Sequence, residues 1–208
     1  MGQKPGSRDR RMIITMKREE AIKKSKELLQ EEKVSGFDHA SRVAYWCRYL
    51  GEKENADLEA LEIAAYLHDI GLNIVGLPTH HIESARMAEA LLREKNVPEE
   101  RVKQIGRIIE HHAMHAPEAE AMEEKIINDA DRIDHLGAIG IVRAIARAIL
   151  VKKEYTGDVS DIPILLRQAI TSTKKRVYTE TAKKLVNEKA LYIEHFIEQL
   201  EKEIAEAQ

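Results

Sequence analysis

Apolar residues recur three and four positions apart along nearly the whole chain, and this spacing decides the fold class. It gathers them on one face of an α-helix, whereas no long stretch alternates with the period of two that an amphipathic strand requires. Glycine and proline interrupt the pattern where helices commonly end, including Gly51, Gly71 and Pro98. We therefore predict an all-α fold, a bundle of helices.

The helical pattern also predicts how the chain is organised. Residues 1–12 are polar, and we expect a disordered arm there. Residues 13–208 contain no internal repeat and no linker long enough to separate a second domain, so we expect one domain. A chain of 208 residues is long enough to bury a substantial core in that way.

Composition excludes several classes of protein. The 33 Lys and Arg residues against 36 Asp and Glu give a net charge of -3, without the basic excess of proteins that bind nucleic acid electrostatically. The single cysteine, Cys47, forms neither an internal disulfide nor a cysteine-based zinc module. The longest apolar runs are far shorter than the roughly 20 residues of a membrane helix. We expect a cytoplasmic protein without a membrane or nucleic-acid partner.

Polar residues at positions that the helical pattern assigns to the core indicate a site. They are His39, His68, Asp69 and Asp131. Buried ionisable groups are costly unless they are paired or bind a metal, and two imidazoles with two carboxylates suit a divalent cation. Because His68 and Asp69 point about 100° apart on a helix, both reach one ion only near a helix end. The glycine at position 71 predicts such an end.

Three segments in order resemble the H…HD…D signature of the HD-domain metal-dependent phosphohydrolases. They are residues 37–43 (FDHASRV), 67–71 (LHDIG) and 128–133 (NDADRI). A later GAIG turn followed by arginine is similar to small, stand-alone HD and HDIG hydrolases. The resemblance implies a single-domain HD-type helical bundle, with an HD core at about 37–151 and C-terminal helices at about 162–206. It also implies metal ligation by His39, His68, Asp69 and Asp131.

The resemblance extends to residues outside the ligand set. His81 and His112 match extra histidines that some HD proteins use for a second metal and others use to hold phosphate. Arg143, or Arg132, is placed to neutralise phosphate oxygens, since guanidinium offers a bidentate fork. We interpret His81, His112 and Arg143 as candidate catalytic residues.

Other ionisable residues near these motifs leave alternatives open. Asp129 is the alternative to Asp131 as a ligand, turned about 160° away on a straight helix. His80, among the remaining histidines, is interpreted as a surface or structural residue, and His111 as a residue flanking the site.

The resemblance implies hydrolysis of a phosphate ester or anhydride in a nucleotide or similar small molecule, by a water activated by one or two divalent ions of Mn, Fe, Ni, Co, Zn or Mg. HD nucleotidases often have an acidic residue a few positions after the HD pair, and this chain has none there. Their particular acid/base mechanism is therefore a weaker expectation for this chain. One alternative is a di-iron HD-type oxygenase with His81 and His112 as ligands. Another is a non-enzymatic nucleotide-sensing module. The long final helix is compatible with a homodimer.

Overall fold

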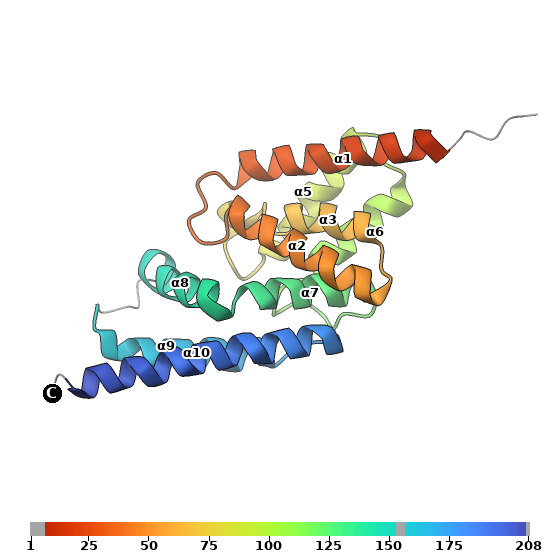
Figure 1. Ribbon diagram of the computed structural model, residues 1–208. Helices are drawn as coiled ribbons and strands as arrows, with labels where there is room; N and C mark the ends of the chain where they lie inside the picture. The colour runs from red at the N-terminus through yellow and green to blue at the C-terminus, as the bar shows by residue number, and fades with distance from the viewer. Residues whose placement is uncertain (1–6, 153–156, 207–208) are drawn as a thin grey trace, which may run out of the picture. The chain divides into compact units, whose positions relative to one another are not determined.

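The computed structural model describes residues 7–152 and 157–206, which form helices and connecting loops and no strand (Figure 1). The predicted all-α fold is therefore confirmed. Contacts within the chain define two compact units, residues 1–127 and 128–208. The single domain expected from the sequence stays a prediction.

The first helix begins earlier than the sequence pattern suggests. Helix α1 covers Ser7–Leu28, so residues 7–12 are helical, although we expected them to belong to a disordered arm. No glycine or proline interrupts the chain between Ser7 and Leu28, so the helix continues to that point. Residues 1–6 of the expected arm lie outside the described residues.

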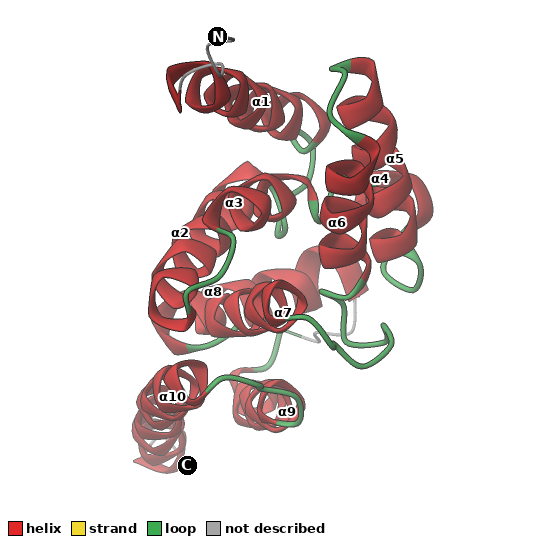
Figure 2. Ribbon diagram, turned by 90° about the vertical axis from the view of Figure 1, so that its right-hand side faces the viewer, coloured by secondary structure: helices red, strands yellow, loops and turns green. Residues whose placement is uncertain are grey.

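The first unit is built around a short apolar helix. The elements of this unit are α1, α2 (Phe37–Glu54), α3 (Leu58–Leu67), α4 (Leu72–Val75), α5 (His80–Glu94), α6 (Glu99–Glu110) and the first part of α7 (Met122–Asp134). Helix α3 packs against α1, α2, α5 and α6, and α5 lies beside α6 (Figure 2). Six of the ten α3 residues are buried, as expected for a helix that is apolar on most sides.

Both ends of α3 are fixed by specific contacts. At its start, the side chain of Asp57 accepts a hydrogen bond from the backbone N–H of Ala60 and pairs with Arg101. At its end, the Gly71 N–H donates to Ser84 Oγ over 2.9 Å. A Cβ atom at position 71 would lie 2.8 Å from the backbone nitrogen of Ser84, so the close approach of α5 requires glycine here.

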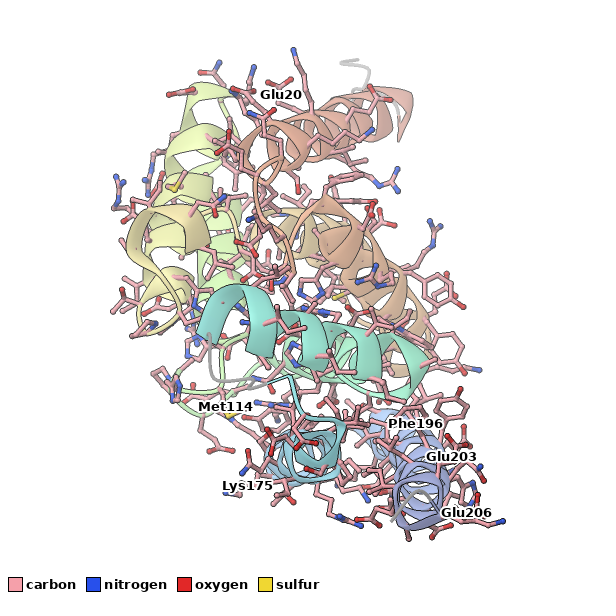
Figure 3. The ribbon with its side chains drawn as sticks, turned by 90° about the vertical axis from the view of Figure 1, so that its left-hand side faces the viewer. Glu20, Met114, Lys175, Phe196, Glu203 and Glu206 are labelled. Atoms are coloured by element: carbon pink, nitrogen blue, oxygen red, sulfur yellow. The ribbon has the colours of Figure 1, made fainter. Side chains whose placement is uncertain are left out.

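The second unit is a smaller group of helices. It contains the rest of α7, α8 (Gly137–Arg147), a π-helical segment (Ala148–Lys152), a 3-10 turn (Val159–Asp161), α9 (Ile162–Lys174) and α10 (Glu180–Glu206). Helices α8 and α9 both pack against α10, and α9 runs beside α10 (Figure 1). The side chains of Phe196, Glu203 and Glu206 mark the second half of α10 (Figure 3). Helices α9 and α10 occupy the residues where C-terminal helices are predicted.

A buried carboxylate on α7 fixes the start of α10. Asp129 Oδ1 accepts the backbone N–H of Tyr178, and Oδ2 accepts both the N–H and the hydroxyl of Thr179, each over 2.8 Å. Burial raises the pKa of Asp129, and these hydrogen bonds oppose that rise. The carboxylate of Asp129 therefore stabilises the start of α10 within the second unit.

Within the described part of the chain, no single helix is both long and apolar enough to cross a membrane. Among the described helices, one pair, Leu58–Val75 and His80–Glu94, meets the length and composition requirement together, and the two segments are bent by 119°.

Candidate metal centre

Two helices of the first unit bring together two histidines and an aspartate. His39 lies on α2, and His68 and Asp69 directly follow the last residue of α3. The Nε2 atoms of the two histidines are 3.3 Å apart. Asp69 Oδ2 lies 3.4 Å from His68 Nε2 and 3.7 Å from His39 Nε2. All three side chains are buried, and these atoms are close enough to share one metal ion.

The other oxygen of Asp69 faces a second pair of histidines. Asp69 Oδ1 is 3.3 Å from Nε2 of His80, at the start of α5, and 3.5 Å from Nε2 of His112, just after α6. The two Nε2 atoms are 3.1 Å apart. These three residues also form a group that can hold a metal ion, so Asp69 is common to two groups.

The second nitrogen of three of these imidazoles is engaged by the backbone. The Nδ1 atoms of His68, His80 and His112 lie 2.7, 2.7 and 2.6 Å from the carbonyl oxygens of Ala65, Leu77 and Ile109. A carbonyl only accepts hydrogen bonds, so each Nδ1 carries the proton and donates. Each neutral ring then has a lone pair on Nε2, the arrangement typical of metal-binding histidines.

The electrostatics of the centre are dominated by Asp69. Burial alone would raise the pKa of Asp69, but the surrounding histidines together hold it well below its usual range. Burial lowers the pKa of His80, yet its hydrogen bond and charge interaction with Asp69 raise it overall. In His112, burial outweighs Asp69 and the pKa falls. The carboxylate is therefore ionised and attracts cations into the site.

The first unit thus brings together four of the residues predicted from sequence, namely His39, His68, Asp69 and His112. The fourth predicted ligand, Asp131, belongs to the second unit, where its Oδ1 lies 3.8 Å from His135 Nε2. Its ligation of the metal stays a prediction. Because Asp129 is hydrogen-bonded to the start of α10, we favour Asp131 over Asp129 as the metal ligand.

The two other candidate catalytic residues lie in different surroundings. His81 is 6% exposed and packs edge-on against His80, with 5.7 Å between ring centroids. Its Nδ1 atom is buried and has no hydrogen-bond partner, and burial lowers its pKa to about 4. Arg143, in the second unit, is buried and pairs with the carboxylate of Asp134. Neither is a member of the two ligand groups.

Sequence reasoning missed His80, which we had interpreted as a surface or structural residue. It is buried, at 8% exposed, and belongs to the second ligand group. Neighbouring residues on a helix point about 100° apart, so only one of His80 and His81 faces Asp69. The preceding loop sets which one does, and no periodicity of the sequence reveals that choice.

Comparisons with known proteins agree with this geometry. Residues 36–136 match the protein family described as HD domain. The Bacillus subtilis (strain 168) protein YpgQ is 32% identical over 200 residues, which cover 91% of this chain and 95% of YpgQ. A solved structure of YpgQ in complex with ADP matches with a TM-score of 0.71 and 30% identity, covering 92% of this chain and 96% of that one. An HD-superfamily hydrolase from Bacillus thuringiensis matches with a TM-score of 0.71 and 29% identity, covering 92% and 98%.

Proposed function

This chain belongs to the HD-domain family, and from that premise we propose that it is a metal-dependent hydrolase of a phosphate ester or anhydride. The proposed substrate is a nucleotide or a similar phosphorylated small molecule. The structures of relatives named as HD-superfamily hydrolases support the reaction type. The structure of YpgQ in complex with ADP supports the substrate class.

One observation carries the proposal. His80 and His112 each donate Nδ1–H to a carbonyl, yet their Nε2 atoms face each other at 3.1 Å beside the carboxylate of Asp69. When both rings are neutral, each Nε2 carries a lone pair and no proton, so the two nitrogens repel at this distance and a cation lying between them removes the repulsion. The donor set of imidazole nitrogen and carboxylate oxygen suits Mn²⁺, Fe²⁺, Co²⁺, Ni²⁺ or Zn²⁺.

Each residue of the metal centre has a distinct proposed role. His39, His68 and Asp69 would hold one ion, and Asp69, His80 and His112 a second. When bound, a divalent cation polarises a phosphoryl oxygen and lowers the pKa of water towards neutrality. Asp131 is a further proposed ligand, as its match to the HD signature implies. His81 stays neutral near pH 7 because its pKa is about 4, so its role is to donate a hydrogen bond rather than a positive charge.

The decisive experiment combines metal analysis with a substrate screen. The purified protein is assayed for bound metal, and then for release of phosphate and pyrophosphate from nucleotides with Mn²⁺, Ni²⁺, Co²⁺ or Mg²⁺. His68→Ala is expected to lose both bound metal and turnover. His111→Ala is the control, because this half-exposed ring contacts the Arg107 carbonyl and belongs to neither ligand group. Full turnover by His68→Ala would contradict the proposal.

The carboxylate of Asp69, shared by the two ligand groups, also favours a second candidate function, that of an oxygenase with a di-iron centre. Two histidine groups that meet at Asp69 have the donor types that iron accepts. The sequence-based version of this alternative used His81 and His112 as iron ligands, whereas the geometry favours His80 in place of His81. Two iron ions per chain with oxygen uptake would favour the oxygenase, and phosphate release under anaerobic conditions with Mn²⁺ would favour the hydrolase.

A further inference from the structure

Helix α8 of the second unit is apolar on its exposed face as well as on its buried face. Between Ala138 and Val151, at the end of the π-helical segment, the only polar side chains are those of Arg143 and Arg147. Arg143 is buried and pairs with Asp134, and Arg147 is half-buried, four residues further along the helix. A helix that is apolar on nearly all sides is normally covered on all sides, so we expect another surface to cover α8.

The exposed apolar side chains of α8 and the π-helical segment follow one another along the helix. They are between 41% and 68% exposed, and we call them the α8 stripe: Ile139, Val142, Ile149, Leu150 and Val151. Val142 follows Ile139 by three residues and precedes Ile149 by seven, the spacing of side chains on one helix face. The π-helical segment has the wider i→i+5 winding, and all three stripe residues within it are exposed.

The area of the α8 stripe is large for a surface that stays in water. At these exposed fractions, five aliphatic residues leave roughly 450 Å² of apolar surface open, and contiguous patches above a few hundred Å² are typical of interaction sites. Two such stripes packed face to face would remove roughly 900 Å² from water, close to the roughly 1,000 Å² at which specific interfaces begin. The half-buried residues Ala144, Ile145 and Ala146 of the same helix would add to this area.

The chemistry of the α8 stripe favours a second copy of this chain over a lipid surface. Helices that lie on membranes have lysine and arginine on their polar face, which attract anionic lipids. From Ala138 to Val151 there is no lysine, and one of the two arginines is already paired with Asp134. A two-fold contact places a surface opposite itself, so a stripe without charges avoids the repulsion between like charges.

We propose that the α8 stripe is the interface of a homodimer, in which α8 and the π-helical segment pack against the same elements of a second copy. Branched side chains at Ile139 and Val142 form ridges, and the small side chains of Ala138 and Ala146 leave gaps for the ridges of the partner. The proposal does not depend on the proposed function, because it involves no ligand of the metal centre. It assigns the dimer contact to α8 rather than to the final helix α10, whose exposed side includes many lysines and glutamates.

The mass of the full chain in solution, measured by analytical ultracentrifugation across a dilution series, tests the proposal. The wild-type protein is expected to sediment with twice the mass of one chain. Val142→Glu changes the most exposed residue of the stripe. It should weaken association about 10-fold or more, because the dimer would bury a carboxylate without a partner. Leu191→Glu is the matched control, since it adds the same charge at an exposed apolar position of α10 and should associate as wild type does.

A second variant and two further measurements complete the test. Ile149→Glu should weaken association as Val142→Glu does, and it decides the question if Val142→Glu does not fold, as judged by circular dichroism. A wild-type protein that is monomeric at every concentration would overturn the proposal, as would association that survives both variants. Loss of association in Leu191→Glu alone would assign the interface to α10 instead. Binding of a monomeric wild-type protein to vesicles of phosphatidylcholine and phosphatidylglycerol, lost in Val142→Glu, would assign the stripe to a lipid surface and overturn the homodimer.

Discussion

Asp69 Oδ1 lies 3.3 Å from His80 Nε2, at the point where the turn after α3 meets the first residue of α5. The other oxygen of Asp69 lies 3.4 Å from His68. A single carboxylate therefore joins two histidine groups contributed by four segments of the first unit. A site of this kind depends on how the helices meet as much as on which side chains they carry.

Asp69→Asn should abolish metal binding at both groups. The amide keeps the size of the side chain but removes the only negative charge that the two groups share. We expect metal affinity to fall at least about 10-fold, and turnover to fall with it. Metal content after dialysis, measured by mass spectrometry, checks this expectation. Asp158→Asn, at an exposed position, is the control. Retention of two ions by Asp69→Asn would show that the shared carboxylate is not a ligand.

His80→Ala and His81→Ala form a matched pair of neighbouring, buried histidines. His80→Ala removes a ligand of the second group, so metal content should fall to about half that of wild type, while the group containing His39 keeps its ion. His81→Ala should keep the wild-type metal content, because its ring belongs to neither group. Metal analysis of the two variants side by side distinguishes them. Loss of metal in His81→Ala alone would reverse the assignment.

The metal centre was predictable where the sequence pattern placed polar residues in a helical core. His39 and the His68–Asp69 pair stand in otherwise apolar stripes, and their burial follows from that pattern. The choice between His80 and His81 was not predictable. It depends on the path of the preceding loop, which contains Gly76 with a positive φ of 72°. No local periodicity encodes such a path.

The structural role of Asp129 was not predictable from the sequence, for a related reason. Its partners, Tyr178 and Thr179, lie about 50 residues further along the chain, in a turn that no helical pattern describes. The all-α fold, in contrast, follows from apolar spacing within each helix and was predicted correctly. Local periodicity determines which segments are helical, whereas long-range contacts determine which polar side chains meet.

Gly71→Ala should destabilise the first unit. Its Cβ atom would meet the Ser84 backbone nitrogen at 2.8 Å, and backbone atoms cannot move aside cheaply. We expect a loss of about 1–3 kcal/mol in the free energy of unfolding, measured with urea, together with weaker metal binding because α5 carries His80. Gly106→Ala is the control, since its Cβ would meet only the flexible end of Glu89. Equal stability of the two variants would contradict this explanation.

The stability of the first unit should depend on pH through Asp57. The hydrogen bonds from Arg101 hold the pKa of Asp57 below its usual value, so the folded state binds its proton more weakly than the unfolded state does. The resulting stabilisation is present above the unfolded pKa of about 4 and is lost as the pH falls through the folded pKa. Asp57→Asn keeps a capping side chain but not the charge, and should cost about 1 kcal/mol at pH 7. In urea unfolding, the difference in the free energy of unfolding between wild type and Asp57→Asn should be smaller at pH 3 than at pH 7. An equal difference at both pH values would contradict the assignment.

Asp129→Ala and Asp131→Ala test the division of tasks between two acids on α7. Asp129→Ala leaves the Tyr178 N–H and both donors of Thr179 without their acceptor, and should cost about 3 kcal/mol or more in the free energy of unfolding. Asp131 is 16% exposed at its side chain and is the proposed metal ligand on α7, so Asp131→Ala should retain most of the stability and lose metal affinity. Urea unfolding and metal analysis of both variants give the two readouts. If Asp129→Ala folded with wild-type stability but lost its metal, Asp129 would be the ligand and the assignments of the two acids would be exchanged.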